Sequence, residues 1–151
     1  MKYSNMGNTN SIIKINFEGV QQTISDKNSY IINTLCASNQ QCLISNTLAI
    51  DDEVAILNNR ISKNKASTII VYGTNACDDS VDKKCQQLVS LGFQNIYVYS
   101  GGLFEWLMLQ DIYGEDEFPT IGKCNDLLEY KNCLLGGTIQ CIASNRLALL
   151  G

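Results

Sequence analysis

The sequence contains no histidine, and this absence removes two kinds of site at once. A histidine-containing metal site and a Cys–His nucleophile pair both need an imidazole, so neither can be built from this chain. Basic residues are also few: 11 stand against 15 acidic ones, which gives a net charge of -4. A chain without a basic excess lacks the attraction that supplies most non-specific affinity for nucleic acid, so we expect no nucleic-acid partner.

Long apolar runs are absent too, and the cysteines form no CxxC pair. No stretch approaches the roughly 18 residues that a membrane span needs, and no basic-then-apolar leader is visible. The cysteine spacing predicts neither a zinc ribbon nor a disulfide framework, so we expect no metal and no cofactor. A reducing compartment, the cytosol or nucleus, is the default location. The seven cysteines are Cys36, Cys42, Cys77, Cys85, Cys124, Cys133 and Cys141.

What is present suits one folded domain. The chain has 151 residues, of which 45% are apolar and 17% charged, a composition that can bury a substantial core. Residues 1–14 are predicted to form a polar arm and residues 15–132 the domain. Residues 133–151 are an apolar extension, for which packing on the domain and an interface are both open.

Short apolar segments alternate with amphipathic ones along the domain, which is the pattern of βαβ units. This alternation predicts an α/β fold with a central, mainly parallel sheet of about five strands and helices on both faces. We expect strands at 30–35, 68–72 and 95–99, and another at 42–50 with a turn at Ser45-Asn46. Helices are expected at 17–24, capped by Asn16, and at 51–63, 80–91, 103–110 and 125–130.

The stretch from Ile69 to Trp106 carries a family resemblance. IIVYG, a loop, a helix and then LGFQNIYVYSGGLFEW resemble the rhodanese-like family, whose pattern is an apolar strand, a catalytic loop that opens a helix, Gly-Phe, a strand, Gly-Gly and Trp. Continued through LMLQDIYGEDEFPT, the stretch is most similar to small rhodanese-like proteins of large DNA viruses of eukaryotes. The shared core spans roughly residues 15–120.

The resemblance places the family's catalytic loop directly after residue 72. In active members the strand leads into a cysteine that accepts a sulfane sulfur, while loop N–H groups and a helix N-terminus stabilise the anion. Gly73 stands at this position here, so the covalent persulfide cannot form there. The resemblance therefore implies a degenerate, non-catalytic domain that acts as a protein-binding or scaffold module. The loop or anion cradle comprises Gly73, Thr74, Asn75, Ala76, Cys77, Asp78, Asp79 and Ser80, with the turn Gly101-Gly102 beside it.

Cys77 keeps an alternative open, namely a sulfurtransferase or redox thiol enzyme that uses a displaced nucleophile. Its acidic neighbours Asp78, Asp79 and Asp82 oppose thiolate formation and favour a structural or incidental cysteine. A carboxylate at Asp78 or Asp79 could instead cap the helix that starts at Ser80, so that the protein itself occupies the cradle.

The partner is expected to be an unidentified protein that binds a face formed by residues 73–79, 100–103 and 115–117. Other conspicuous residues have structural explanations: Trp106 and Phe104 are expected in the core, and Cys42 and Cys85 as small buried apolar residues.

One N-terminal motif bears on location. Met6 to Ser11 match the myristoylation pattern M-G-x-x-x-[ST], so Gly7 becomes the acceptor if translation starts at Met6 rather than Met1. A chance match is the open alternative. One acyl chain gives marginal, reversible membrane contact. The expected location is the cytoplasm, which for a viral protein means the host cytoplasm or the virion, with membrane association if Gly7 is acylated.

Overall fold

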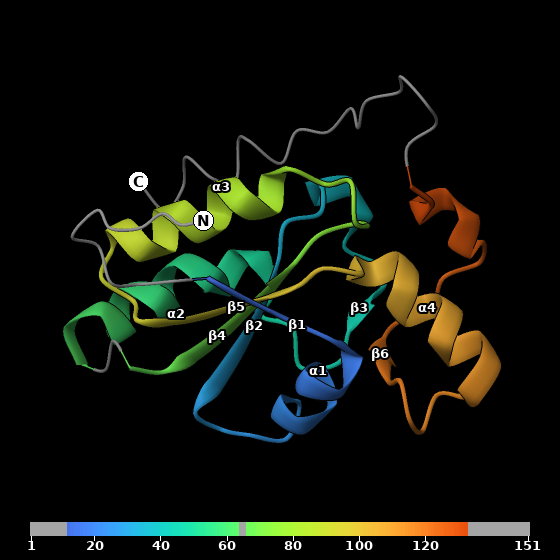
Figure 1. Cartoon of the computed structure of the whole chain (residues 1–151), viewed down its shortest axis with the longest axis horizontal. Helices are drawn as coiled ribbons and strands as arrows, with labels where there is room; N and C mark the ends of the chain where they lie inside the picture. Colours follow the sequence, from blue (N-terminus) through green and yellow to red (C-terminus); the bar gives the residue numbers. More distant parts are fainter. Residues whose placement is uncertain (1–11, 64–65, 133–151) are drawn as a thin grey trace.

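The computed structural model describes residues 12–63 and 66–132 (Figure 1). The predictions for Gly7, for most of the polar arm and for residues 133–151 lie outside the described residues. In the described part of the chain, no helix combines the length and the apolar character needed to cross a membrane.

A four-stranded parallel sheet forms the centre of the domain, in the order β1-β5-β4-β2. Its strands are β1 (Ile13–Ile15), β2 (Ser29–Asn33), β4 (Thr68–Tyr72) and β5 (Asn95–Tyr99). The continuous apolar runs of β4 and β2 suit strands that are covered on both faces. The strands predicted at 30–35, 68–72 and 95–99 are therefore confirmed.

β1 departs from the sequence prediction, since residues 1–14 were expected to be an arm outside the domain. Ile13 and Lys14 instead pair with Tyr97 and Val98 of β5, so the sheet begins before the expected boundary at residue 15. Three residues carry too little pattern to predict a strand. Pairing with β5, more than 80 positions along the chain, determines this one.

Of the strand predicted at 42–50, only the part before the predicted turn at Ser45-Asn46 is extended, and the part after it is not a strand. Only β3 (Leu43–Ile44) is extended, and it pairs antiparallel with β6 (Thr120–Ile121) in a separate two-stranded sheet. Asn46 then adopts a left-handed φ of 68°, which turns the chain toward α2 (Ile50–Lys63). The main sheet consequently has four described strands instead of about five.

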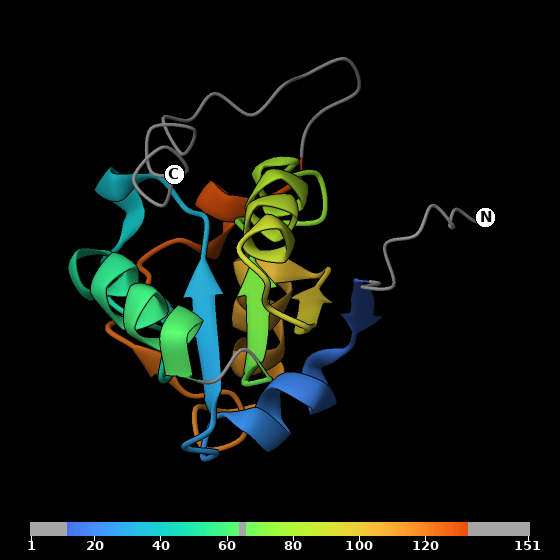
Figure 2. The same ribbon diagram turned by 90° about the vertical axis from the view of Figure 1, so that its left-hand side faces the viewer.

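Helices cover both faces of the sheet, as predicted (Figures 1 and 2). α2 and α3 (Ser80–Ser90) pack on one face, and α1 (Phe17–Thr23) and α4 (Gly102–Tyr113) on the other. Asn16 caps α1 by accepting hydrogen bonds from the N–H groups of Glu18 and Gly19. The last predicted helix is a short 3-10 helix, η2 (Leu127–Tyr130), and another, η1 (Ala37–Asn39), follows β2.

Two apolar clusters hold these layers together. Ile69 and Val71 of β4 point into the cluster under α2 and α3, and the alternate residues Ile70 and Tyr72 into the cluster under α1 and α4. Trp106 is fully buried in the second cluster. Cys42 and Cys85 are buried as well, which confirms the structural explanation of all three residues.

Because the four strands are parallel, their carboxyl ends lie at one edge of the sheet. The loop after β4, the turn after β5 and Thr34 after β2 meet at this edge. Binding sites of open α/β sheets lie at the carboxyl ends of the strands, so the candidate site is sought here.

Candidate functional site

The loop from Gly73 to Asp79 links the end of β4 to the start of α3, and the N-terminus of α4 supports it. Gly73 and Thr74 accept backbone hydrogen bonds from Leu103 and Phe104, with N–O distances of 3.0 and 2.9 Å. Gly102 has a φ of +70°, and a Cβ there would lie 2.8 Å from the carbonyl oxygen of Gly73. The Gly101-Gly102 turn therefore lies beside the loop, and glycine is required at 102 because backbone packs directly against it.

The carboxylate of Asp78 points into the loop. Its Oδ2 accepts the N–H of Thr74 at 2.9 Å, and its Oδ1 accepts the N–H of Ser80 at 3.1 Å and the hydroxyl of Ser80 at 2.5 Å. Asp79 makes no such hydrogen bond to the helix start. Of the two carboxylates considered from the sequence, Asp78 thus binds both the loop and the first amide of α3.

The position that follows β4 has no room for a side chain. A Cβ on Gly73 would lie 2.6 Å from Oδ2 of Asp78 and 2.7 Å from a methyl carbon of Val81. Both distances are shorter than a van der Waals contact, so a larger residue at 73 requires Asp78 and Val81 to move. The protein's own carboxylate fills the space in front of Gly73.

Two further loop amides also bond to side-chain oxygens. The N–H of Cys77 donates to Oδ1 of Asn75 at 2.9 Å, and the N–H of Ala76 donates to Oδ1 of Asn132 at 3.2 Å. Together with the amides of Thr74 and Ser80, four N–H groups between residues 74 and 80 have side-chain acceptors within the protein, and the N–H of Asp78 donates to the backbone oxygen of Asn75. Backbone N–H groups that already have acceptors are not available to an external anion.

Cys77 lies exposed on this loop and borders a cavity of about 190 Å³. Asp78, Asp79 and Asp82 also line the cavity, and Lys14 of β1 contributes a positive charge. The lining carries more negative than positive charge, as the sequence predicted around Cys77. In the described part of the chain, no group of three or more cysteine and carboxylate side chains is placed to hold a metal ion.

The match to known families decides the identity of the fold. The family model for the rhodanese-like domain matches residues 27–109, more than half of the chain. The chain belongs to the rhodanese-like domain family. A search of curated proteins finds no match.

Solved structures agree with this rhodanese-like fold. The Alr3790 protein from Anabaena sp. aligns with a TM-score of 0.54 at 24% identity, over 72% of this chain and 82% of that one. The BH2092 protein from Bacillus halodurans aligns with a TM-score of 0.55 at 17% identity, over 73% and 77% of the two chains. At these identities the likeness concerns the fold alone, and it confirms the α/β class.

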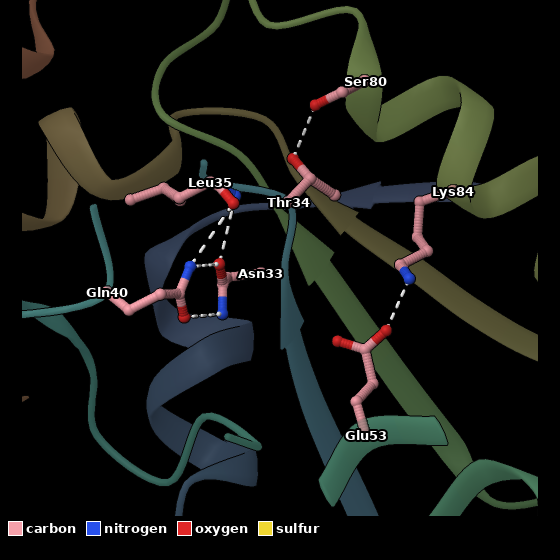
Figure 3. Close-up of polar contacts among 7 residues, drawn as sticks. All are labelled: Asn33, Thr34, Leu35, Gln40, Glu53, Ser80 and Lys84. Atoms are coloured by element: carbon pink, nitrogen blue, oxygen red, sulfur yellow. Dashed lines mark hydrogen bonds and ion pairs between the residues drawn. The ribbon is translucent and has the colours of Figure 1, made fainter. Parts of the chain in front are cut away.

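The rhodanese-like domain contains a polar layer behind the loop that the sequence did not indicate (Figure 3). The hydroxyl groups of Ser80 and Thr34 are hydrogen-bonded at 2.8 Å, which ties the start of α3 to the end of β2. Lys84 of α3 and Glu53 of α2 form a buried ion pair with an N–O distance of 2.5 Å. From the sequence, Glu53 was expected only to interact favourably with the helix dipole in the first turn of its helix. No sequence pattern indicated that it pairs with Lys84.

Residues 115–117 do not belong to the loop face of the rhodanese-like domain, which corrects the prediction. They follow the C-terminal end of α4, whose 12 residues span roughly 18 Å from its N-terminus at the loop. Gln21 of α1 donates to the backbone oxygen of Glu117 at 2.8 Å, so this acidic stretch lies beside α1. α4 starts near the loop, as predicted, and its length separates residues 115–117 from the loop face.

The cysteines of the domain also differ from one expectation. Cys36 is disulfide-bonded, whereas Cys42, Cys77, Cys85 and Cys124 carry free thiols. The sequence analysis expected a reducing compartment and no disulfide framework, since the cysteine spacing shows only local motifs. Which cysteines approach one another depends on the path of the chain.

Proposed function

We propose that this rhodanese-like domain is a non-catalytic module that binds a protein partner or acts as a scaffold, with Gly73 at the position of the family's nucleophile. The observation that carries the proposal is the position of the Asp78 carboxylate, which accepts hydrogen bonds from the backbone N–H groups of Thr74 and Ser80. A carboxylate at this point would repel thiosulfate or a persulfide and uses N–H groups that would otherwise stabilise such an anion.

The proposed binding surface is the loop face, which we define as residues 73–79 and 100–103. Ala76, Cys77 and Asp79 are exposed on it. The backbone of the loop is held by α4 through Gly73 and Thr74, which restricts the conformations of the surface. A preorganised surface loses little conformational entropy on binding, which suits a scaffold.

Sulfur trapping tests the proposal. The protein is incubated with thiosulfate, treated with a thiol alkylator and examined by mass spectrometry at each cysteine. We expect no sulfane sulfur adduct on any cysteine. A persulfide on Cys77 that disappears in Cys77→Ser would overturn the proposal.

A pair of restored variants tests the role of Asp78. Gly73→Cys alone should stay inactive because Asp78 fills the space for the new side chain, whereas Gly73→Cys with Asp78→Ala should acquire a persulfide. Gly73→Cys with Asp79→Ala is the matched control, since Asp79 makes no cap hydrogen bond. Equal sulfur loading in all three variants would show that Asp78 does not block the loop.

Cys77 supports a second candidate function, a sulfurtransferase or redox thiol enzyme with a displaced nucleophile. The favouring observation is that its free thiol is exposed beside the 190 Å³ cavity, with Lys14 on the lining. In the sulfurtransferase form, the Cys77 thiolate attacks the sulfane sulfur of thiosulfate, the S–S bond breaks, sulfite leaves and a cysteine persulfide remains. A persulfide confined to Cys77 in the trapping experiment would establish this function instead.

We make two separate proposals about the origin and the location of the protein. The first is that it is related to small rhodanese-like proteins of large DNA viruses. We propose a cytoplasmic protein whose Gly7 is acylated when translation starts at Met6, which would add a reversible membrane contact. The intact mass of protein made in eukaryotic cells checks this: loss of residues 1–6 and gain of an acyl group is the expected result. A retained Met1 without acyl mass would rule it out.

A further inference from the structure

The described part of the chain ends beside the loop face. Backbone oxygens of Tyr130 and Lys131 both accept hydrogen bonds from Nδ2 of Asn75, each at 2.9 Å. Asn132 in turn accepts the N–H of Ala76 at 3.2 Å. Residues 130–132 therefore contact the loop through three hydrogen bonds that join segments 55 or 56 positions apart in the chain.

One side chain serves both segments. Asn75 is 4% exposed, and while its Nδ2 binds residues 130 and 131, its Oδ1 accepts the N–H of Cys77 at 2.9 Å. The shape of the loop and the position of residues 130–132 thus depend on the same buried amide. A change in either segment alters the partners of the other.

Residues 130–132 are held in place mainly at their N-terminal end, where Tyr130 is buried. Tyr130 is 3% exposed within the cluster under α1 and α4, and Asp126 caps η2 by accepting the N–H of Leu128 at 3.0 Å. Lys131 and Asn132 are exposed, so the loop contacts of these two residues have water as the alternative. Each such hydrogen bond to an exposed residue contributes little to the free energy of unfolding, because a hydrogen bond to water can replace it.

We infer that residues 130–132 form a latch on the loop, which regulates the loop face by occupying the side-chain amide of Asn75 and the N–H of Ala76. Latched, the Asn75 amide and the Ala76 N–H are occupied. Released, both face outward and match a protein segment that offers backbone and side-chain oxygens in the same arrangement. The regulatory consequence rests on the proposed function of the loop face; the latch itself does not.

Hydrogen exchange on the full-length protein tests the latch. Asn75→Asp keeps an oxygen for the N–H of Cys77 but removes both donors to residues 130 and 131 and places a carboxylate against their carbonyl groups. We expect amides 74–80 and 127–132 to exchange together, roughly tenfold faster than in the wild type. Asn125→Asp is the matched control, because it makes the same chemical change at an exposed position outside the latch.

A milder pair of variants acts from the other side. Asn132→Ala removes the acceptor of the Ala76 N–H, and Asn132→Asp retains it. We expect faster exchange at Ala76 and at residues 129–131 for the alanine variant alone, by a few-fold. Since Asn132 is exposed, this pair stays informative even if Asn75→Asp unfolds the domain.

The inference would be overturned if each substitution accelerated exchange only in its own segment, or if the two Asn132 variants behaved alike. These measurements need neither partner nor sulfur donor. Uncoupled exchange would leave the non-catalytic proposal in place, and a persulfide on Cys77 would overturn that proposal without affecting the latch.

Discussion

Burial divides the free thiols of the domain into two groups. Cys42 and Cys85 are fully buried, and burial raises the pKa of Cys42 to about 11 and that of Cys85 to about 12, with smaller contributions from Cys124 and Asp82 respectively. Cys77 is exposed. Because the thiolate is the reactive form, the two buried thiols are inert at neutral pH for two reasons, access and protonation.

We predict that an alkylator at neutral pH modifies Cys77 in the native protein, and modifies Cys42 and Cys85 only after urea unfolding. Mass spectrometry of peptides at successive times checks the order. Alkylation of Cys85 at the rate of Cys77 without denaturant would contradict the burial of α3 against the sheet.

The same pKa shifts predict a pH dependence of stability. The folded-state pKa of Cys85 lies above its ordinary value of 9.0, so the neutral thiol contributes its full stability below pH 9. This contribution is lost as the pH rises from 9 toward 12. Urea unfolding across this range should show a shallower decline of the unfolding free energy for Cys85→Ala than for the wild type. Equal slopes would contradict the prediction.

At the scale of elements, α2 and α3 are joined by the pair Glu53–Lys84, whose side chains are 4% and 1% exposed (Figure 3). Each charge is removed from water and depends on polar partners for compensation. The pair therefore fixes how the two helices lie against each other, and Ser80 one turn earlier in α3 binds Thr34 of the adjoining strand end. The start of α3, which carries the loop, is positioned by these contacts.

We predict that Glu53→Gln or Lys84→Met alone lowers the unfolding free energy by about 3–5 kcal/mol, because the remaining charge stays buried and loses the ion pair. Glu53→Leu with Lys84→Met should recover most of this loss. The control is the exposed pair Glu115–Lys123, whose rupture by Lys123→Met should leave the unfolding free energy nearly unchanged because water screens both charges. Urea unfolding measures all variants, and single core variants as mild as the surface control would refute the prediction.

At the scale of the whole molecule, the two apolar clusters share one sheet. Alternate residues of β4 and β5 enter opposite clusters. Separation of these strands would therefore remove buried contacts from both clusters. Small domains of this kind unfold in one cooperative transition. Trp106, the single tryptophan, reports on one cluster, while circular dichroism reports on all helices.

We predict that Leu88→Ala in α3 and Leu107→Ala in α4 each cost about 2–5 kcal/mol and move the same transition. Tryptophan fluorescence and far-ultraviolet circular dichroism should give coincident unfolding curves for both variants. For Leu88→Ala, a circular dichroism change that precedes the fluorescence change would mean that the clusters unfold separately.

Local pattern was enough to predict most of the fold from the sequence. The apolar runs of β2, β4 and β5, the amphipathic α2 and α3 and the burial of Trp106 follow from periodicity and from Gly-Gly, which act over a few residues. The loop of residues 73–80 was found in the same way, since it is one continuous segment between a strand and a helix. Short elements such as β1 and β6 carry too few residues for any pattern and form by pairing with distant strands.

Only the tertiary structure decided how the candidate site is built. It selected Asp78 over Asp79 as the carboxylate in the loop, brought residues 130–132 to Asn75, paired Glu53 with Lys84 and separated residues 115–117 from the loop face. These outcomes depend on the direction of single side chains or on contacts between residues 31 to 96 positions apart. Residue type and spacing limit such contacts but do not choose among them, because the choice is made by packing of the whole chain.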